Sequence, residues 1–362
     1  MLAKALFWSA AGALAWTHAG YPLATAALVR LRRRPVRAAD VTPTVALIVA
    51  AHNEQAVIER RVANLRALDY PADKVELVVT SDASTDRTDD LAEAAGARVI
   101  RNPRGGKVAA QDRAVRETNG EIVAFSDANA TWAPDALRQL VRVFADPDVA
   151  YVTGRVRYED AAGGNQEGVY WRFETWLRAQ ESELGSLTGG YGPIYAVRRG
   201  DYVEVDPRYG HDLALPYLMV QRGRRAVYEP RALSSEKPTP SNESEYRRKV
   251  RMFEHCWLIV LKGRMLRGQP LGYAIELVSH RHLRYASGIL HLVLLGASFA
   301  LVRESELYAV ATGLQLGVVA AAAAGVALPR YYVLITWATN VALWNYLRRG
   351  VPATWQIAEG TR

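Results

Sequence analysis

Acidic and amide side chains follow short apolar runs in this sequence, at positions where they can meet a polar ligand. Asp82 comes shortly after residues 75–79, and Asp127 and Asn129 come shortly after residues 121–125. A carboxylate at the end of a strand can accept hydrogen bonds from a base or a ribose. Two oxygen-bearing side chains two residues apart can point the same way and hold Mg²⁺ or Mn²⁺. Such an ion neutralises a diphosphate, so the pattern favours chemistry on a phosphorylated ligand.

Two more polar segments lie beside the same series of runs. Ala51, Asn53 and Glu54 follow residues 45–49, and Lys107 closes a glycine turn that opens a helical stretch. Backbone amides at such a turn, together with a lysine, can meet an anion. Both segments are therefore consistent with a phosphate-bearing ligand.

Each of these signals also has a plainer interpretation. A simple loop-to-helix turn explains residues 102–107 as well as an anion site does. An Asx-type turn explains Asp127 taken alone. For Ser84, Thr85 or Asp86, the cap of the following helix is the better interpretation. The order of the segments along the chain has to decide between these possibilities.

A parallel sheet is the element that would bring these segments together. Runs rich in β-formers alternate with stretches that carry apolar residues at helical spacing, which predicts a doubly wound α/β domain. In such a sheet, ligands bind outside the carboxyl ends of the strands. The expected strands are residues 45–49, 75–79, 97–100 and 121–125, and the expected helices are residues 54–68, 85–95 and 107–118.

We predict a transmembrane helix within residues 1–30, because residues 5–29 form an Ala-rich apolar run that is about long enough to cross a bilayer. A cluster of arginines follows the run, and only Lys4 precedes it, which favours a transmembrane helix over a cleaved signal peptide. By the positive-inside rule, the segment after the arginines lies in the cytoplasm.

The C-terminal third returns to membrane-like composition. We predict amphipathic interfacial helices over residues 251–284, two or three transmembrane segments within residues 285–348, and a tail over residues 349–362. The apolar stretches are residues 286–302, 307–328 and 331–347. If all three crossed, the basic tail would end outside, against the charge rule, so one can be re-entrant or interfacial. Buried helices of a soluble protein are the alternative.

Composition narrows the class of protein. The chain has 362 residues, of which 50% are hydrophobic, enough for one large α/β domain plus several membrane segments. Its single cysteine, Cys256, excludes a disulfide framework and suits a reducing compartment. The net charge of +8 is concentrated beside the apolar segments, which indicates membrane topology rather than nucleic-acid binding. The clustered arginines are Arg30, Arg32, Arg33, Arg34, Arg37, Arg281, Arg284, Arg348 and Arg349.

Taken in order, the segments between residues 45 and 251 resemble the family 2 glycosyltransferases, which have the GT-A fold. Ala51, Asn53 and Glu54 lie in what looks like the first-strand motif of that family. Asp82 resembles its base-recognising aspartate, and Lys107 resembles its basic donor contact. Asp127 is similar to the first residue of the DxD metal motif, and Asn129 stands in place of the second aspartate.

The resemblance continues into the second half of the domain. Residues 188–195 are similar to the glycine-rich segment that shapes the acceptor side, which places Gly189 and Gly190 there. His211 and Asp212 resemble the ED or DD pair, which implies Asp212 as general base and puts His211 where an acid is usual, on the acceptor side.

Residues 247–252 resemble the QxxRW segment of membrane-bound synthases. Arg251 matches its arginine, but Arg248 replaces the glutamine and Met252 replaces the tryptophan. The resemblance implies that Arg248 and Arg251 contact the departing diphosphate, since guanidinium groups grip phosphate bidentately. It does not imply processive synthesis.

The resemblance implies a metal-dependent, inverting hexosyltransferase with a cytoplasmic GT-A domain over residues 41–250. Its donor would be a nucleotide sugar, most often UDP-linked in this family, with Mg²⁺ or Mn²⁺ as cofactor. The membrane segments suggest a lipid-linked or polysaccharide acceptor, contact with membrane lipid, and a multi-pass protein of the inner (plasma) membrane. Two alternatives stay open: a catalytically silent nucleotide-sugar-binding subunit, and a transporter, for which too few spans are expected. The donor sugar, the acceptor, the linkage and the oligomeric state are not legible.

Overall fold

The computed structural model describes residues 1–158, 168–238 and 242–354, and the chain divides into two compact units. The α/β unit comprises Thr25–Pro240, Arg267–Tyr273 and the C-terminal segment from Pro352. The helical unit comprises Met1–Ala24, Ser241–Leu266 and Ala274–Val351. The main span of the α/β unit thus ends at Pro240 rather than at residue 250, which places Arg248 and Arg251 in the helical unit.

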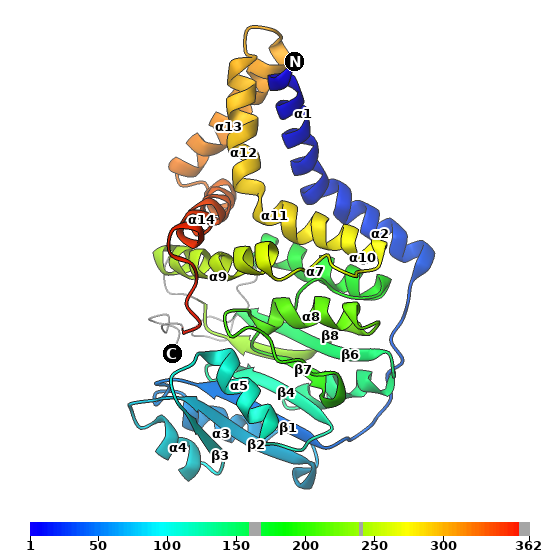
Figure 1. Cartoon of the computed structure of the whole chain (residues 1–362), viewed down its shortest axis with the longest axis vertical. Coiled ribbons are helices and arrows are strands. Elements are labelled where there is room, and N and C mark those ends of the chain that lie inside the picture. The colour runs from blue at the N-terminus through cyan, green and yellow to red at the C-terminus, as the bar shows by residue number, and fades with distance from the viewer. Residues whose placement is uncertain (159–167, 239–241, 355–362) are drawn as a thin grey trace. The chain divides into compact units, whose positions relative to one another are not determined.

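Within the described residues, eight strands form one sheet in the order β3-β2-β1-β4-β7-β6-β8-β5 (Figure 1). The first four strands are parallel to one another and confirm the runs predicted from the sequence. Their residues are largely buried because helices cover the sheet, as a near-continuous apolar run requires. These strands are β1 (Val45–Ala51), β2 (Val75–Asp82), β3 (Arg98–Asn102) and β4 (Ile122–Asp127).

The other four strands make the sheet mixed. β7 runs antiparallel to both β4 and β6, whereas β6 and β8 are parallel to each other. β5 pairs antiparallel with the end of β8, so the chain crosses from one part of the sheet to another directly after Asp127. These strands are β5 (Thr131–Trp132), β6 (Val149–Tyr158), β7 (Tyr195–Arg198) and β8 (Arg225–Glu236).

Helices connect the strands and supply the remaining core. The amphipathic pattern predicted α3, α4 and α5, whose apolar faces bury residues such as Ile58, Ala92 and Val108. The helices of the α/β unit are α3 (Ile58–Arg66), α4 (Thr88–Ala94), α5 (Lys107–Arg116), α6 (Ala136–Val141), α7 (Val169–Leu184) and α8 (His211–Gln221).

The predicted N-terminal apolar run is helical. It comprises α1 (Leu2–Ala15), a π-helical turn (Trp16–Gly20) and α2 (Tyr21–Arg32). In the helical unit α1 packs against α12 (Ser287–Ala300), where Phe7 joins a small apolar cluster with Ala297, Leu301 and Tyr308.

The described C-terminal region is mostly helical. It contains α9 (Asn242–Lys262), α10 (Leu271–Glu276), a π-helical turn (Leu277–His282), α11 (Leu283–Tyr285), α13 (Glu306–Ala323) and α14 (Ala327–Arg349) (Figure 1). α9 packs against α14, where the buried carboxylate of Glu254 accepts hydrogen bonds from Asn345 and Arg349.

One helix among the described residues, α13, is by itself long and apolar enough to cross a membrane. The segments Leu271–Tyr285 and Ser287–Ala300 pass the same test only as a pair, bent by 66°. α12 alone has 14 residues and rises about 21 Å, short of a hydrocarbon core of about 30 Å. Length and composition therefore give a weak indication of membrane association, less than the several spans predicted from the sequence.

Candidate functional site

The loops after β1 and β2 bind each other. Asn53 adopts a left-handed backbone conformation with φ of 54°, and its side-chain oxygen accepts a hydrogen bond from the backbone of Thr85 at 2.8 Å. The Asn53 amide donates to Ser84 at 3.1 Å, and the Glu54 amide donates to Thr88 at 2.7 Å. Ala51 is buried as the last residue of β1. The first-strand motif thus shapes the edge of the sheet through the second loop.

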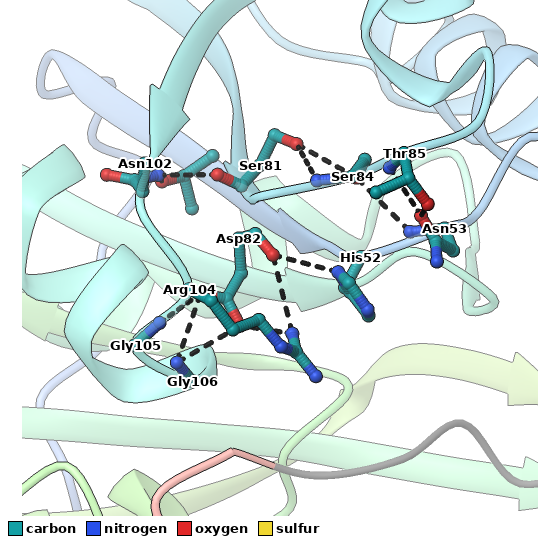
Figure 2. Close-up of polar contacts among 11 residues, drawn as sticks. His52, Asn53, Ser81, Asp82, Ser84, Thr85, Asn102, Arg104, Gly105 and Gly106 are labelled. Atoms are coloured by element: carbon teal, nitrogen blue, oxygen red, sulfur yellow. Dashed lines mark hydrogen bonds and ion pairs between the residues drawn. The ribbon is translucent and has the colours of Figure 1, made fainter.

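Asp82 holds the glycine turn that precedes α5 (Figure 2). Its carboxylate accepts backbone hydrogen bonds from Gly105 at 2.7 Å and from Gly106 at 3.0 Å, and it pairs with Arg104. Its backbone carbonyl contacts the His52 ring at 2.8 Å. Asp82 is only 3% exposed, so in this structure its carboxylate is occupied by the protein.

Gly106 is required where it stands. Its φ of 93° is a conformation that residues with a β-carbon rarely adopt, and a β-carbon there would lie 2.2 Å from the carbonyl oxygen of Ala353. The C-terminal segment of the α/β unit therefore contacts the start of α5, one residue before Lys107.

Lys107 reaches across to the end of β4. Its ammonium pairs with Oδ1 of Asp127, and both side chains are about four-fifths buried. A β-carbon on Gly192 would lie 3.7 Å from that ammonium and 3.8 Å from Asp127 Oδ2, so the glycine-rich segment borders the same point. Asn129 lies two residues further on and is partly exposed.

Asp212 lies in the first turn of α8 and contacts the glycine-rich segment. The Gly190 amide donates to the Asp212 backbone carbonyl at 2.6 Å. Burial raises the pKa of Tyr195 well above its ordinary value, and the charges of Asp127 and Asp212 act in the same direction, after those of Tyr202 and Tyr151. Both carboxylates thus lie within electrostatic range of the Tyr195 phenol.

His211 is placed differently from the prediction. It is 3% exposed, and its Nδ1 lies 2.9 Å from the Tyr195 hydroxyl while its Nε2 lies 3.3 Å from the Tyr202 hydroxyl. The Tyr202 hydroxyl also donates to Asp112. Because the ring is enclosed by these partners, His211 cannot face an acceptor directly. Its contacts instead position the residue next to Asp212.

Helix α7 contacts the segment that contains Gly189 and Gly190. Buried Arg178 donates to the Gly189 carbonyl at 2.8 Å and to the Tyr191 hydroxyl at 2.6 Å, and its guanidinium lies 4.2 Å from the Tyr191 ring centroid. A β-carbon on Gly190 would lie 2.1 Å from the Tyr151 hydroxyl, which explains the glycine. The sequence analysis missed Arg178, although a charged residue on the buried side of a helix is a signal for it.

Arg248 and Arg251 lie on α9 in the helical unit. Arg248 makes a bidentate pair with Glu245, with both contacts at 2.9 Å. Burial lowers the pKa of the Arg251 guanidinium, Arg248 lowers it further, and Glu254 opposes the change. A meeting of either arginine with a donor diphosphate stays a prediction.

The residues around Asp127 fit a weakly held divalent ion. Within the described part of the chain, no group of three or more His, Cys, Asp or Glu side chains can hold a metal. Mg²⁺ commonly uses one or two carboxylates, several waters and the phosphates of a substrate. Asp127 with Asn129 meets that smaller requirement, and the Lys107 ammonium already places positive charge on this carboxylate.

Comparison with known proteins identifies the class of this site. The model of glycosyl transferase family 2 matches residues 46–205, which contain β1 to β7. Residues 46–205 therefore match the family 2 glycosyltransferases, and the α/β unit has a GT-A-like fold, as the sequence predicted.

Particular relatives share this domain. The chain is 32% identical to a beta-monoglucosyldiacylglycerol synthase of Synechocystis sp. over 42% of its own length and 33% of that protein. It is 27% identical to an N-acetylglucosaminyltransferase of Sinorhizobium fredii, over 56% of this chain and 54% of the relative. The chain thus spans only about a third to a half of these relatives.

A solved structure resembles more of the chain. A mannosyltransferase from Pyrobaculum calidifontis, in complex with GDP-Man and Mn²⁺, aligns with a TM-score of 0.73 and 24% sequence identity. The alignment covers 96% of this chain and 98% of that one. At this identity the likeness establishes the fold.

Proposed function

We propose that this protein is an inverting glycosyltransferase that transfers a sugar from a nucleotide-sugar donor to a lipid-linked or polysaccharide acceptor. One observation carries the proposal. Gly192 lies so near Lys107 and Asp127 that an added β-carbon would meet both, and the Gly190 amide holds the Asp212 backbone, so one glycine-rich segment borders the donor-side and acceptor-side groups. Direct displacement at an anomeric carbon needs a base and a leaving-group site on opposite sides of the sugar.

Asp212 is the proposed general base. It stands partly exposed at the start of α8, and its backbone is fixed by the Gly190 amide. His211 beside it is locked between two tyrosines, which restrains the helix end from which the Asp212 carboxylate projects. A base so positioned can take the proton of an acceptor hydroxyl within hydrogen-bond reach.

Asp127 and Lys107 form the proposed leaving-group side. Lys107 would bind the donor diphosphate, because its ammonium lies at Asp127, the residue that would hold the ion. Asp127, with Asn129, would hold Mg²⁺ or Mn²⁺ together with that diphosphate. When bound, such an ion stabilises negative charge on the departing nucleoside diphosphate.

The exposed surface of the helical unit is the reason for proposing an acceptor at a membrane. Large apolar side chains are exposed along α12 to α14, among them Phe299 at 70% and Leu314 at 67%. Such a surface is unusual for a protein surrounded by water. We propose that these helices attach the enzyme to the inner (plasma) membrane, with α13 crossing it, and that the α/β unit faces the cytoplasm. Multi-pass insertion would require the bent pair or α14 to cross as well.

A donor screen tests the proposal. The full chain, purified in lipid, would be mixed with UDP-linked and GDP-linked hexoses and a lipid extract, and nucleotide release would be measured. We expect release with one donor class, suppression by EDTA, and restoration by Mn²⁺ or Mg²⁺.

The Asp212→Asn variant tests the proposed general base. An amide cannot act as base, so release should fall by about 100- to 10,000-fold while the donor still binds. Retained turnover in this variant would remove Asp212 from the mechanism. Donor binding without consumption by the unmodified protein would instead identify a silent binding subunit.

A further inference from the structure

Helix α3 carries a charged side chain inside the core of the α/β unit. Arg61 is 2% exposed and shares the buried face of the helix with Ile58, Val62 and Leu65. Its neighbour Arg60 is exposed to solvent. Removing a guanidinium from water is costly unless it is well paired, so the position of Arg61 calls for a specific set of partners.

The partners of Arg61 lie at the start of the turn that carries Asp127. One guanidinium nitrogen donates to the Ser126 hydroxyl at 2.5 Å, and the Ser126 hydroxyl in turn donates to the Asp127 carbonyl at 3.0 Å. Another guanidinium nitrogen donates to the side chain of Asn64, one helical turn further along α3. The guanidinium carbon also lies 5.3 Å from the Trp132 ring centroid.

Asn64 holds the other end of the same turn. Its side-chain oxygen accepts from the Trp132 amide at 2.9 Å, and its side-chain nitrogen donates to the Trp132 carbonyl at 3.0 Å. The Trp132 indole donates to the Pro193 carbonyl at 3.0 Å. The residue before Pro193 is Gly192, which borders Lys107 and Asp127. The contacts therefore run from α3 through the turn to the glycine-rich segment.

The charge of Arg61 also acts at Asp127. Burial lowers the pKa of the Arg61 guanidinium to about 9, and the charges of Asp127 and then Glu236 oppose this change. The guanidinium is thus protonated at neutral pH. The Arg61 guanidinium and the Lys107 ammonium are thus two cations that act on the single carboxylate of Asp127. Their combined charge suits the surroundings of Asp127 to an anionic ligand.

We propose that Arg61 and Asn64 are positioning residues for the donor and metal site: from a single helical turn they fix both ends of the segment 126–132, which presents Asp127 and Asn129. Residues that orient a ligating carboxylate from behind commonly change metal affinity by about 10- to 100-fold when they are replaced. The identity of the ligand rests on the proposed function, whereas the restraint on the turn does not.

Arg61→Met tests the restraint directly, with Arg60→Met as the matched control on the exposed face of α3. Hydrogen–deuterium exchange of the ligand-free full chain would be measured for residues 126–132. We expect exchange there to rise roughly tenfold or more in Arg61→Met, because hydrogen bonds to a charged donor are lost, and to stay unchanged in Arg60→Met. Equal exchange in both variants would overturn the proposal.

Asn64→Ala gives a second test that leaves the buried charge in place. It should raise exchange at the Trp132 end of the turn, and Arg61→Lys, which keeps the charge but loses the fork, should raise it at the Ser126 end. These variants keep the inference falsifiable if Arg61→Met does not fold. If exchange at residues 126–132 stays as slow in Asn64→Ala and Arg61→Lys as in the unmodified protein, the inference is refuted.

Ligand binding separates positioning from mere stabilisation. Binding of UDP and GDP would be titrated with and without Mn²⁺, alongside thermal unfolding. We expect Mn²⁺-dependent binding, measured well below the unfolding midpoint, to weaken about 10- to 100-fold in Arg61→Met. A lowered midpoint with unchanged binding would make Arg61 purely structural. If the unmodified protein binds neither nucleotide, the proposed function fails while the exchange result still stands.

Discussion

Asp82 and Asp127 end neighbouring parts of the same parallel sheet, yet their surroundings differ. Asp82 is 3% exposed and is surrounded by two backbone amides and Arg104, all from the turn that opens α5. Asp127 keeps a fifth of its side chain exposed and pairs with Lys107, the first residue of α5. The first carboxylate is used by the fold, whereas the second remains accessible to a ligand. Similar positions in a sheet therefore do not imply similar roles.

The largest expected effect is loss of sugar transfer in Asp127→Asn, which would set Asp127 apart from Asp82. Removing the charge would weaken the ion and the diphosphate site, so nucleotide release should fall about 100-fold or more. The free energy of unfolding should also fall, because the Lys107 ammonium, which is about four-fifths buried, loses this carboxylate. Nucleotide release and thermal unfolding would be compared with the unmodified protein. Full activity without added metal would end the assignment of Asp127.

Asp82→Asn should act mainly on stability. An amide cannot accept from Gly105, Gly106 and Arg104 together, so the free energy of unfolding should fall by about 1–3 kcal/mol. Chemical denaturation would measure the change, and Arg104→Gln would separate the arginine from the two amides. An unchanged stability with lost donor binding would break the comparison and restore Asp82 as a base-recognising residue.

Lys107→Met should give the smallest and most selective effect. Without the ammonium, Mn²⁺ no longer competes for Oδ1 of Asp127, so binding of Mn²⁺ alone should tighten. Binding of UDP or GDP without metal should weaken roughly tenfold through loss of a charged contact. Calorimetry with each ligand separately would test both signs. Weaker Mn²⁺ binding in this variant would mean that Lys107 supports the ion rather than opposing it.

The sequence predicted the strands that position the site because their signal is local. Four apolar runs, each followed by polar residues, match β1 to β4, and the parallel order brings Asp82 and Asp127 to one edge. The helical character of the terminal segments was equally legible from their apolar residues. The number of membrane-length helices was not, because helix breaks such as the bend between α11 and α12 depend on packing.

Burial decided what the sequence analysis left open or misplaced. His211 was expected on the acceptor side. Its ring is instead enclosed by Tyr195 and Tyr202, which precede α8 in the sequence. Arg61 and Arg178 were overlooked because a charged residue within a helical pattern ordinarily faces water. Ser126, which Arg61 contacts, is 65 residues away in sequence, and Gly189, which Arg178 contacts, lies in a different segment from α7, so only the folded chain brings these groups together.

The sequence itself determined three features: the succession of strands along the chain, the glycine turn before Lys107 and the acids at the strand ends. Each depends on periodicity or turn chemistry, which act over a few residues. Which acid caps a turn and which remains open to a ligand was decided by the tertiary structure. The reason is physical: the exposure of a carboxylate depends on every group that packs around it, and the chain must fold before those groups are neighbours.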